Sequence, residues 1–132
     1  MKILLVDDSR TIRNIQKGVL AQLGYTDIAE AADGLEALDA VKAHRPDLIL
    51  VDWNMPNMDG ITLVRQLRQT DKMLPIIMVT TEAERSRVIE ALRAGVNNYV
   101  VKPFTPQTLS EKIQQTAAKA GLTTPATAPA AS

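Results

Sequence analysis

Five short apolar runs recur along the chain, and the stretches between them have the apolar spacing of amphipathic helices. The runs are Ile3–Val6, Ile28–Ala32, Leu48–Val51, Ile76–Val79 and Tyr99–Val101. Continuous apolar runs of this length with polar ends are typical of parallel strands that are buried on both faces. We therefore predict five strands of a parallel sheet.

The stretches between and after the runs predict five helices, because their apolar residues recur at helical spacing. The first covers about residues 9–23, the second runs from Asp33-Gly34 to Pro46, the third begins after Asp59-Gly60, the fourth covers about 82–94, and the fifth runs from Thr105 to Gly121. The spacing points Leu35 of the second helix inward, and Val88, Ile89 and Leu92 are the apolar positions of the fourth.

Strict alternation of strands and helices predicts an α/β fold, a doubly wound (βα)5 five-stranded parallel sheet, because right-handed crossovers leave few other topologies. The 132 residues suffice for one domain with a sizeable core. We assign residues 1–121 to this domain. Residues 122–132 contain almost only Thr, Pro, Ala and Ser, and we expect a disordered tail there.

Composition excludes several classes of function. Fifteen basic residues balance fifteen acidic ones, which gives no indication of binding to nucleic acid or to a membrane surface. Cysteine is absent, so disulfide and thiol chemistry are excluded. The first apolar run is too short for a signal peptide or a membrane span. We expect a soluble, cytoplasmic and monomeric protein.

Four of the five predicted strands end at reactive side chains. Asp7 and Asp8 follow the first strand, Asp52 the third, Thr80 the fourth and Lys102 the fifth. Because the carboxyl ends of parallel strands share one edge of the sheet, these groups should meet in one crevice. Singly, Asp8 is explained equally well as a helix cap and Lys102 as a solvated lysine, but their joint occurrence favours a site.

Charge indicates what this crevice would bind. Two carboxylates ~5 Å apart repel by about 3 kcal/mol at an effective dielectric constant of about 20. Three carboxylates against one lysine would therefore be stabilised by raised pKa values or by a divalent cation. Carboxylate oxygens favour Mg²⁺, which shares its coordination shell readily with a phosphate. Because no His, Cys or Ser lies beside a base, a carboxylate is the expected nucleophile, and it would form an aspartyl phosphate.

These motifs together resemble the receiver domain of two-component response regulators. The resemblance extends from about Lys2 to Ala120, and its motifs are Asp7-Asp8, Val51-Asp52, Met55–Gly60, Val79-Thr80 and Lys102–Phe104. It implies the flavodoxin-like version of the fold, with strand order 2-1-3-4-5, and a cis peptide bond between Lys102 and Pro103. Within the family, the sequence around Asp52 and Lys102 is most similar to that of chemotaxis regulators.

The resemblance also implies the role of each site residue. Asp52 would be phosphorylated by a histidine kinase, with Thr80 and Tyr99 as the switch and Lys102 binding the phosphoryl group. Mg²⁺ would be held, directly or through water, by Asp7, Asp8, Asp52 and the backbone carbonyl of Asn54. We expect Asn54 and Glu82 to tune hydrolysis, and Trp53 to be partly exposed beside Asp52.

We expect the signal to leave through a protein surface, because no output domain follows Gly121. The expected output face consists of Arg85, Val88, Tyr99, Phe104 and Lys112. Its partner would be a phosphorylation-dependent protein target such as the flagellar motor switch. The alternative function is that of a stand-alone receiver that acts as a phosphorelay intermediate or a phosphate sink. Where this chain has Thr81, such chemotaxis regulators more often have the smaller alanine. How Thr81 affects access to the phosphoryl pocket is therefore a second open question.

Rival classes lack their defining residues. The turn after the first strand is Asp7–Arg10 and not the glycine-rich loop of a dinucleotide-binding fold, and the P-loop motif is absent. A flavodoxin would have a phosphate-binding Ser/Thr/Gly loop in place of Asp7 and Asp8. A haloacid-dehalogenase-type phosphatase is the most serious rival, but it needs a second aspartate two residues after the first, where this chain has Ser9.

Overall fold

The computed structural model describes residues 1–122. The predicted tail therefore lies, apart from Leu122, outside the described residues. The strands are β1 (Ile3–Val6), β2 (Ile28–Ala31), β3 (Leu48–Val51), β4 (Ile76–Thr80) and β5 (Asn98–Val101). The helices are α1 (Arg10–Gln22), α2 (Gly34–His44), α3 (Gly60–Thr70), α4 (Arg85–Ala94) and α5 (Pro106–Lys119).

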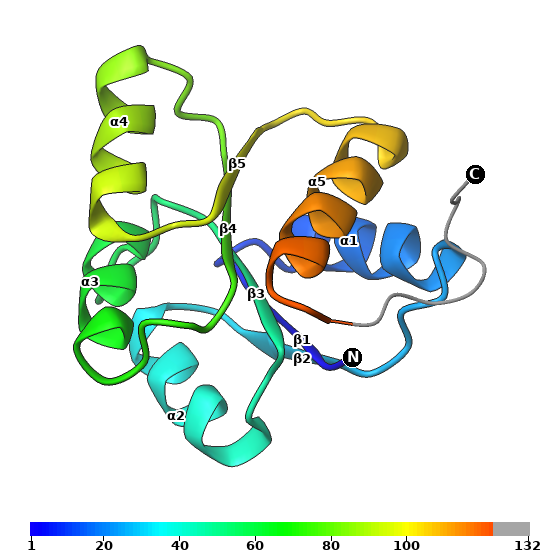
Figure 1. Ribbon diagram of the computed structural model, residues 1–132, viewed down its shortest axis with the longest axis horizontal. Coiled ribbons are helices and arrows are strands. Elements are labelled where there is room, and N and C mark those ends of the chain that lie inside the picture. Colours follow the sequence, from blue (N-terminus) through cyan, green and yellow to red (C-terminus); the bar gives the residue numbers. More distant parts are fainter. Residues whose placement is uncertain (123–132) are drawn as a thin grey trace.

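The five strands form one parallel sheet in the order β2-β1-β3-β4-β5, which confirms the predicted doubly wound fold. Figure 1 shows the sheet between two layers of helices, with α1 and α5 on one side and α2, α3 and α4 on the other. β1 and β3 are paired in register from Ile3 with Leu48 to Val6 with Val51. Their carboxyl ends are therefore level with each other.

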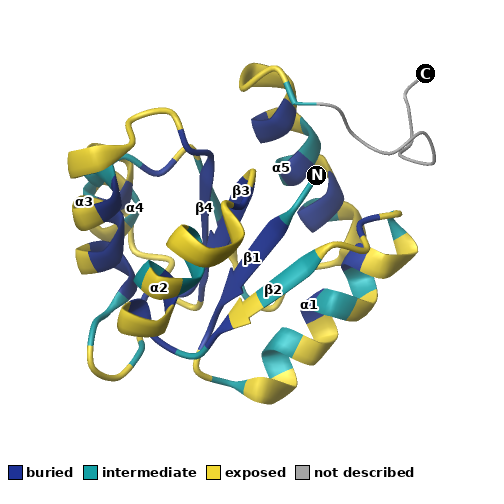
Figure 2. Ribbon diagram, turned by 90° about the horizontal axis from the view of Figure 1, so that it is seen from below, coloured by how far each residue is buried: buried dark blue, intermediate teal, exposed yellow. Residues whose placement is uncertain are grey.

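The core has two halves, one on each face of the sheet. Alternate residues of a strand belong to different halves: Leu4 and Val6 lie in one cluster, and Ile3 and Leu5 lie in the other. All four β1 residues are at most 1% exposed. The central strands β1, β3 and β4 are buried along their length (Figure 2). This burial on both faces explains why the sequence shows continuous apolar runs instead of alternation.

Two expectations about the helices were wrong. Helix α4 begins at Arg85, three residues later than predicted, because residues 82–84 form the connection from β4. Leu35 was predicted to point inward but is 51% exposed, and the buried residues of α2 are Gly34 and Ala37. Ile89 and Leu92 of α4 are also exposed, and Ala91 is the buried residue of that helix. Within residues 1–122, no helix combines the length and apolar character needed to span a membrane.

Candidate functional site

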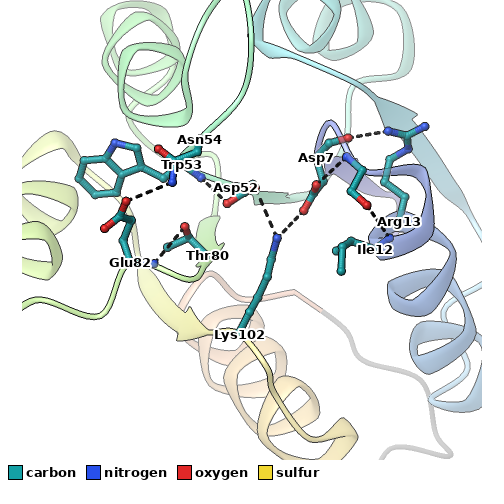
Figure 3. A network of polar contacts seen from close by, with 10 residues as sticks. Asp7, Ile12, Arg13, Asp52, Trp53, Asn54, Thr80, Glu82 and Lys102 are labelled. Atoms are coloured by element: carbon teal, nitrogen blue, oxygen red, sulfur yellow. Dashed lines mark hydrogen bonds and ion pairs between the residues drawn. The ribbon is translucent and has the colours of Figure 1, made fainter.

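The reactive side chains predicted at the strand ends meet at one edge of the sheet. Asp7 directly follows β1, Asp52 follows β3, Thr80 is the last residue of β4, and Lys102 follows β5. Figure 3 shows Lys102 reaching from the end of β5 toward Asp52 and Asp7. The parallel topology therefore brings together residues that are up to 95 positions apart in the sequence.

Lys102 is shared unequally between two carboxylates. Its Nζ lies 2.6 Å from Oδ2 of Asp7 and 3.4 Å from Oδ2 of Asp52. Asp7 is held further because its Oδ1 accepts a hydrogen bond from the backbone N–H of Ser9, and its carbonyl oxygen accepts one from the Arg13 guanidinium. Sequence reasoning missed Arg13, since a single arginine in an amphipathic helix carries no distinguishing signal. The result is a rigid, buried ion pair beside Asp52.

Asp7, Asp8 and Asp52 form the candidate metal centre. One carboxylate oxygen from each residue lies within 4.8 Å of the others. Asp7 and Asp52 are buried, whereas Asp8 is exposed and therefore open to solvent on one side. An all-oxygen donor set with an open side fits a hard divalent cation that keeps part of its water shell, as Mg²⁺ does. The donor chemistry thus fits the metal that the sequence predicted.

The carboxylate of Asp52 is oriented by its own loop. Its Oδ1 accepts a hydrogen bond of 2.8 Å from the backbone N–H of Trp53, while its Oδ2 faces Lys102. A Cβ at position 60 would come within 2.0 Å of the Asp52 carbonyl oxygen, so glycine is required for this close approach of α3 to the loop. Gly60 N–H also donates to the Trp53 carbonyl. The acceptor loop is therefore firmly seated on the start of α3.

The environment of Asp52 disfavours its charged form. Burial is the largest effect and raises the pKa of the Asp52 carboxyl, and the negative charge of Asp7 raises it further. The charge of Lys102 and hydrogen bonds from Thr80 and the Trp53 backbone oppose this rise without cancelling it. A carboxylate whose charge is only partly compensated is well placed to bind a cation or an electrophile.

Thr80 and the residues after it form the other side of the site. Thr80 is completely buried, and its hydroxyl accepts a hydrogen bond from the backbone N–H of Glu82. The side chains of Asn54 and Glu82 are hydrogen-bonded to each other at 3.1 Å, which the sequence did not indicate (Figure 3). Tyr99 is half-buried, and its hydroxyl donates to the carbonyl oxygen of Glu82. Burial raises the pKa of Tyr99 to about 12.

The prediction that Trp53 is partly exposed was wrong, because only 3% of the residue is exposed. Its ring packs within the core cluster that lies against α3 and α4. The guanidinium of Arg87 lies over this ring, 5.1 Å from its centroid. The sequence missed this contact, since no short-range pattern relates position 87 to position 53.

The remaining predicted residues lie on α4, on β5, in the loop that follows β5, and on α5. Figure 1 shows β5 between α4 and α5. Arg85 is exposed, and the other four are half-buried: Val88, Tyr99, Phe104 and Lys112. Thr81 is exposed immediately after β4. The peptide bond between Lys102 and Pro103 is cis, which confirms the expectation drawn from the resemblance.

Comparisons with known proteins agree with this geometry. The family model "Response regulator receiver domain" matches residues 3–114. The chain is 52% identical over 117 residues to chemotaxis protein CheY1 of Helicobacter pylori, covering 86% of this chain and 94% of the relative. It is also 52% identical over 117 residues to chemotaxis protein CheY of Pseudomonas aeruginosa, covering 87% and 94%.

A solved structure also shares this fold. That of chemotaxis protein CheY4 of Vibrio cholerae superimposes with a TM-score of 0.81 at 39% sequence identity, over 87% of this chain and 97% of the other.

Proposed function

This chain belongs to the response regulator receiver domain family, and on that premise we propose that Asp52 accepts a phosphoryl group from a histidine kinase. The phosphorylated form would then bind a downstream target differently from the unphosphorylated form. The observation that carries the proposal is the position of Asp52, a buried and only partly compensated carboxylate between Lys102 and Thr80.

The coarser part of this function follows from the family itself. The chain is a homologue of the chemotaxis protein CheY and is therefore a signalling protein of the response regulator class, not a catalytic enzyme. A homologue of this kind has a kinase as phosphodonor and a downstream target. This finding removes the haloacid-dehalogenase-type phosphatase from the alternatives.

The proposed chemistry is a phosphoryl transfer to carboxylate oxygen. Oδ2 of Asp52 forms a bond to phosphorus while the phosphorus–nitrogen bond of the kinase's phosphohistidine breaks, and the bonding electron pair stays on the imidazole nitrogen. The Trp53 N–H holds Oδ1 and so fixes the orientation of the carboxylate. Lys102 and Thr80 flank the acceptor, and their donors would stabilise the charge on the transferred oxygens.

Mg²⁺ would be held by Asp7, Asp8, Asp52 and the backbone carbonyl of Asn54. A bound divalent cation supplies charge neutralisation between the carboxylates and the incoming phosphate. The chain's own part is to hold the Asp7 carboxylate in place, which the hydrogen bonds from the Ser9 N–H and the Lys102 ammonium do. Asp8 adds an exposed oxygen that needs no rearrangement of the core.

The same reasoning makes Thr80 and Tyr99 the proposed switch. A phosphoryl group on Asp52 offers Thr80 a charge-assisted hydrogen bond, which is stronger than the bond of 3.4 Å that its hydroxyl now accepts from the Glu82 N–H. Tyr99 is bonded to the Glu82 carbonyl, so a movement of residues 80–82 would be felt directly by Tyr99. The movement of Tyr99 would in turn change the output face, which consists of Arg85, Val88, Tyr99, Phe104 and Lys112.

We also propose the finer features of this function that the family alone does not supply. The target would be the flagellar motor switch, and the protein would act in the cytoplasm as a monomer, without nucleic acid or membrane. Residues 1–121 would form the receiver domain, with 122–132 as a tail. The alternative, a phosphorelay intermediate or phosphate sink, would transfer the phosphoryl group onward to a histidine and would not need the output face.

Labelling with a small phosphodonor tests the acceptor. In the presence of Mg²⁺ the wild-type protein should incorporate one phosphoryl group and Asp52→Asn should incorporate none. Asp59→Asn is the matched control, since Asp59 is an aspartate of the same loop that caps α3 and lies outside the site. Labelling of Asp52→Asn at a comparable rate would reject the assignment.

A further inference from the structure

Helix α4 is held differently from the other four helices at its start. In each of the other four helices, the side chain of the N-cap residue accepts a hydrogen bond from a backbone N–H of the first turn. These N-cap residues are Ser9 of α1, Asp33 of α2, Asp59 of α3 and Thr105 of α5. The residue that precedes α4 at the N-cap position is Glu84, and its side chain makes no such bond. Its first turn contains two arginines and no acidic residue, although the helix dipole disfavours positive charge at this end. Capping and charge therefore do not explain why α4 begins here.

The opposite end of α4 is anchored firmly. The guanidinium of Arg68, in α3, donates two hydrogen bonds of 3.0 and 2.8 Å to the carbonyl of Gly95 and one to the side chain of Asn97. Asn97 in turn accepts the backbone N–H of Ile76 at the start of β4. The carboxyl end of α4 is thus tied to both its neighbouring helix and the sheet.

Arg87 connects the first turn of α4 to the site. Its guanidinium lies over the Trp53 ring at 5.1 Å. The Trp53 backbone N–H holds Oδ1 of Asp52, so a single residue separates Arg87 from the acceptor carboxylate. Figure 3 shows the Trp53 ring on the side of Asp52 away from Asp7 and Lys102. The positive charge of Arg87 also acts on Tyr99, whose pKa it lowers against the effect of burial.

The orientation of Arg87 is supported by a neighbour on the same face of α4. Glu90 lies 3.8 Å from the Arg87 guanidinium and 3.1 Å from that of Arg65 in α3. This bridge between the helices places a negative charge next to Arg87 and offsets part of the unfavourable interaction with the dipole. A continuous series of contacts therefore runs from the acceptor loop along one face of α4 to α3, through Trp53, Arg87, Glu90 and Arg65.

We propose that Arg87 is a positioning residue that fastens the first turn of α4 to the acceptor loop by its cation–π contact with Trp53. A change at Asp52 would then reach the output face through a second route, in addition to the one through Thr80 and Tyr99. This signalling role rests on the proposed function. The fastening itself does not, because it is a property of the unphosphorylated protein.

Amide hydrogen exchange in the unphosphorylated protein tests the fastening. The amides of Val88 and Ile89 report the first turn, because Val88 N–H donates to the carbonyl of Glu84. In Arg87→Gln these amides should exchange about two- to fivefold faster, as expected from losing a partly exposed cation–π contact. Arg87→Lys keeps a cation that can lie over the ring, and it should restore most of the protection.

Arg93→Gln is the matched control. Arg93 is an exposed arginine of the same helix, and within residues 1–122 it makes no ion pair or side-chain hydrogen bond. Exchange at Val88 and Ile89 should be unchanged in this variant. Equal acceleration in Arg93→Gln, wild-type exchange in Arg87→Gln, or failure of Arg87→Lys to restore protection would each overturn the proposal.

A second arm tests the signalling role with beryllofluoride as a phosphoryl mimic in the presence of Mg²⁺. Wild-type protein should show a change in exchange at Val88 on adding the mimic, and Arg87→Gln should lose at least half of that change. An equal change in both proteins would show that Arg87 does not carry the signal. If neither protein responds, the failure lies with the proposed function, and the first arm alone decides the fastening.

Discussion

The two sides of Asp52 are built in contrasting ways. On one side, Asp7 and Lys102 form a buried pair whose side chains are 2% and 12% exposed, tied further to the start of α1. On the other side, Thr80 leads into residues 81–84 and an α4 start without a side-chain cap, where Arg87 is 45% exposed. The first side holds charges in a fixed arrangement. The second is fastened by a few hydrogen bonds and a cation–π contact.

This difference suggests a division of labour. A buried ion pair is costly to rearrange, because either partner left alone would be an uncompensated charge. Hydrogen bonds and a cation–π contact near the surface are each worth about 1 kcal/mol, so a phosphoryl group can exchange one set for another. We infer that the Asp7–Lys102 side supports the chemistry and that the Thr80–α4 side moves. The first two of the following predictions each test one side without directly altering the other.

The largest effect is expected from Tyr99→Ala, which alters only the moving side. Phosphorylation at Asp52 should proceed at the wild-type rate, since the Tyr99 hydroxyl donates to the Glu82 carbonyl and, within residues 1–122, makes no hydrogen bond to Asp52. Binding of the target should lose most of its dependence on phosphorylation. A dependence of about twentyfold corresponds to about 1.8 kcal/mol of coupling. Titration of the target with both forms measures this, and a full phosphorylation-dependent gain in Tyr99→Ala would place the exit route on another face.

The fixed side is tested by Asp8→Ala, which removes one oxygen donor and one charge from the metal centre. Mg²⁺ should bind about tenfold more weakly or not at all, because few protein oxygens hold it. Emission of Trp53 reports the binding, since the Trp53 N–H is bonded to Asp52 and this is the only tryptophan. The fold should be unaffected because Asp8 is exposed. An unchanged Mg²⁺ titration would show that the cation binds elsewhere.

A severalfold effect is expected at the boundary between the two sides, where Asn54 and Glu82 are hydrogen-bonded to each other. We predict that this pair orders the water that attacks phosphorus and returns Asp52 to a free carboxylate. Replacing both residues with bulkier or oppositely charged ones should lengthen the life of the phosphoprotein. Decay of the label after the donor is removed gives the rate. If the double variant decays at the wild-type rate, Asn54 and Glu82 do not control the hydrolysis of the phosphoprotein.

The smallest effect concerns stability. The pKa of Asp52 is raised by folding, so its ionised form destabilises the folded state at a pH above the folded pKa. This penalty is progressively lost as the pH falls through the folded pKa toward the unfolded one. Asp52→Asn should therefore raise Tm at neutral pH by a few degrees, where about 1 kcal/mol corresponds to roughly 4 °C. The gain should disappear below about pH 4, and a gain that persists there would point to packing.

The sequence predicted the residues at the strand ends and missed contacts that depend on how helices and loops pack. Asp7, Asp52, Thr80 and Lys102 were found because parallel strands place their carboxyl ends at one edge, so position in the chain dictates position in space. Trp53 and Leu35 were misplaced, because the burial of a single side chain depends on how helices pack against each other. The Arg87–Trp53 and Asn54–Glu82 contacts join loops and helices far apart in sequence, and no local pattern encodes such pairs.

The central claim is that Asp52 alone receives the phosphoryl group. Reduction of the phosphorylated protein with borohydride converts an acyl-phosphorylated aspartate to homoserine, and peptide mass spectrometry then locates the modified residue. Homoserine should be found at position 52 and nowhere else, and it should be absent when the phosphodonor is omitted. Homoserine at position 7 or 8, or a phosphorylated protein that yields none, would contradict the account.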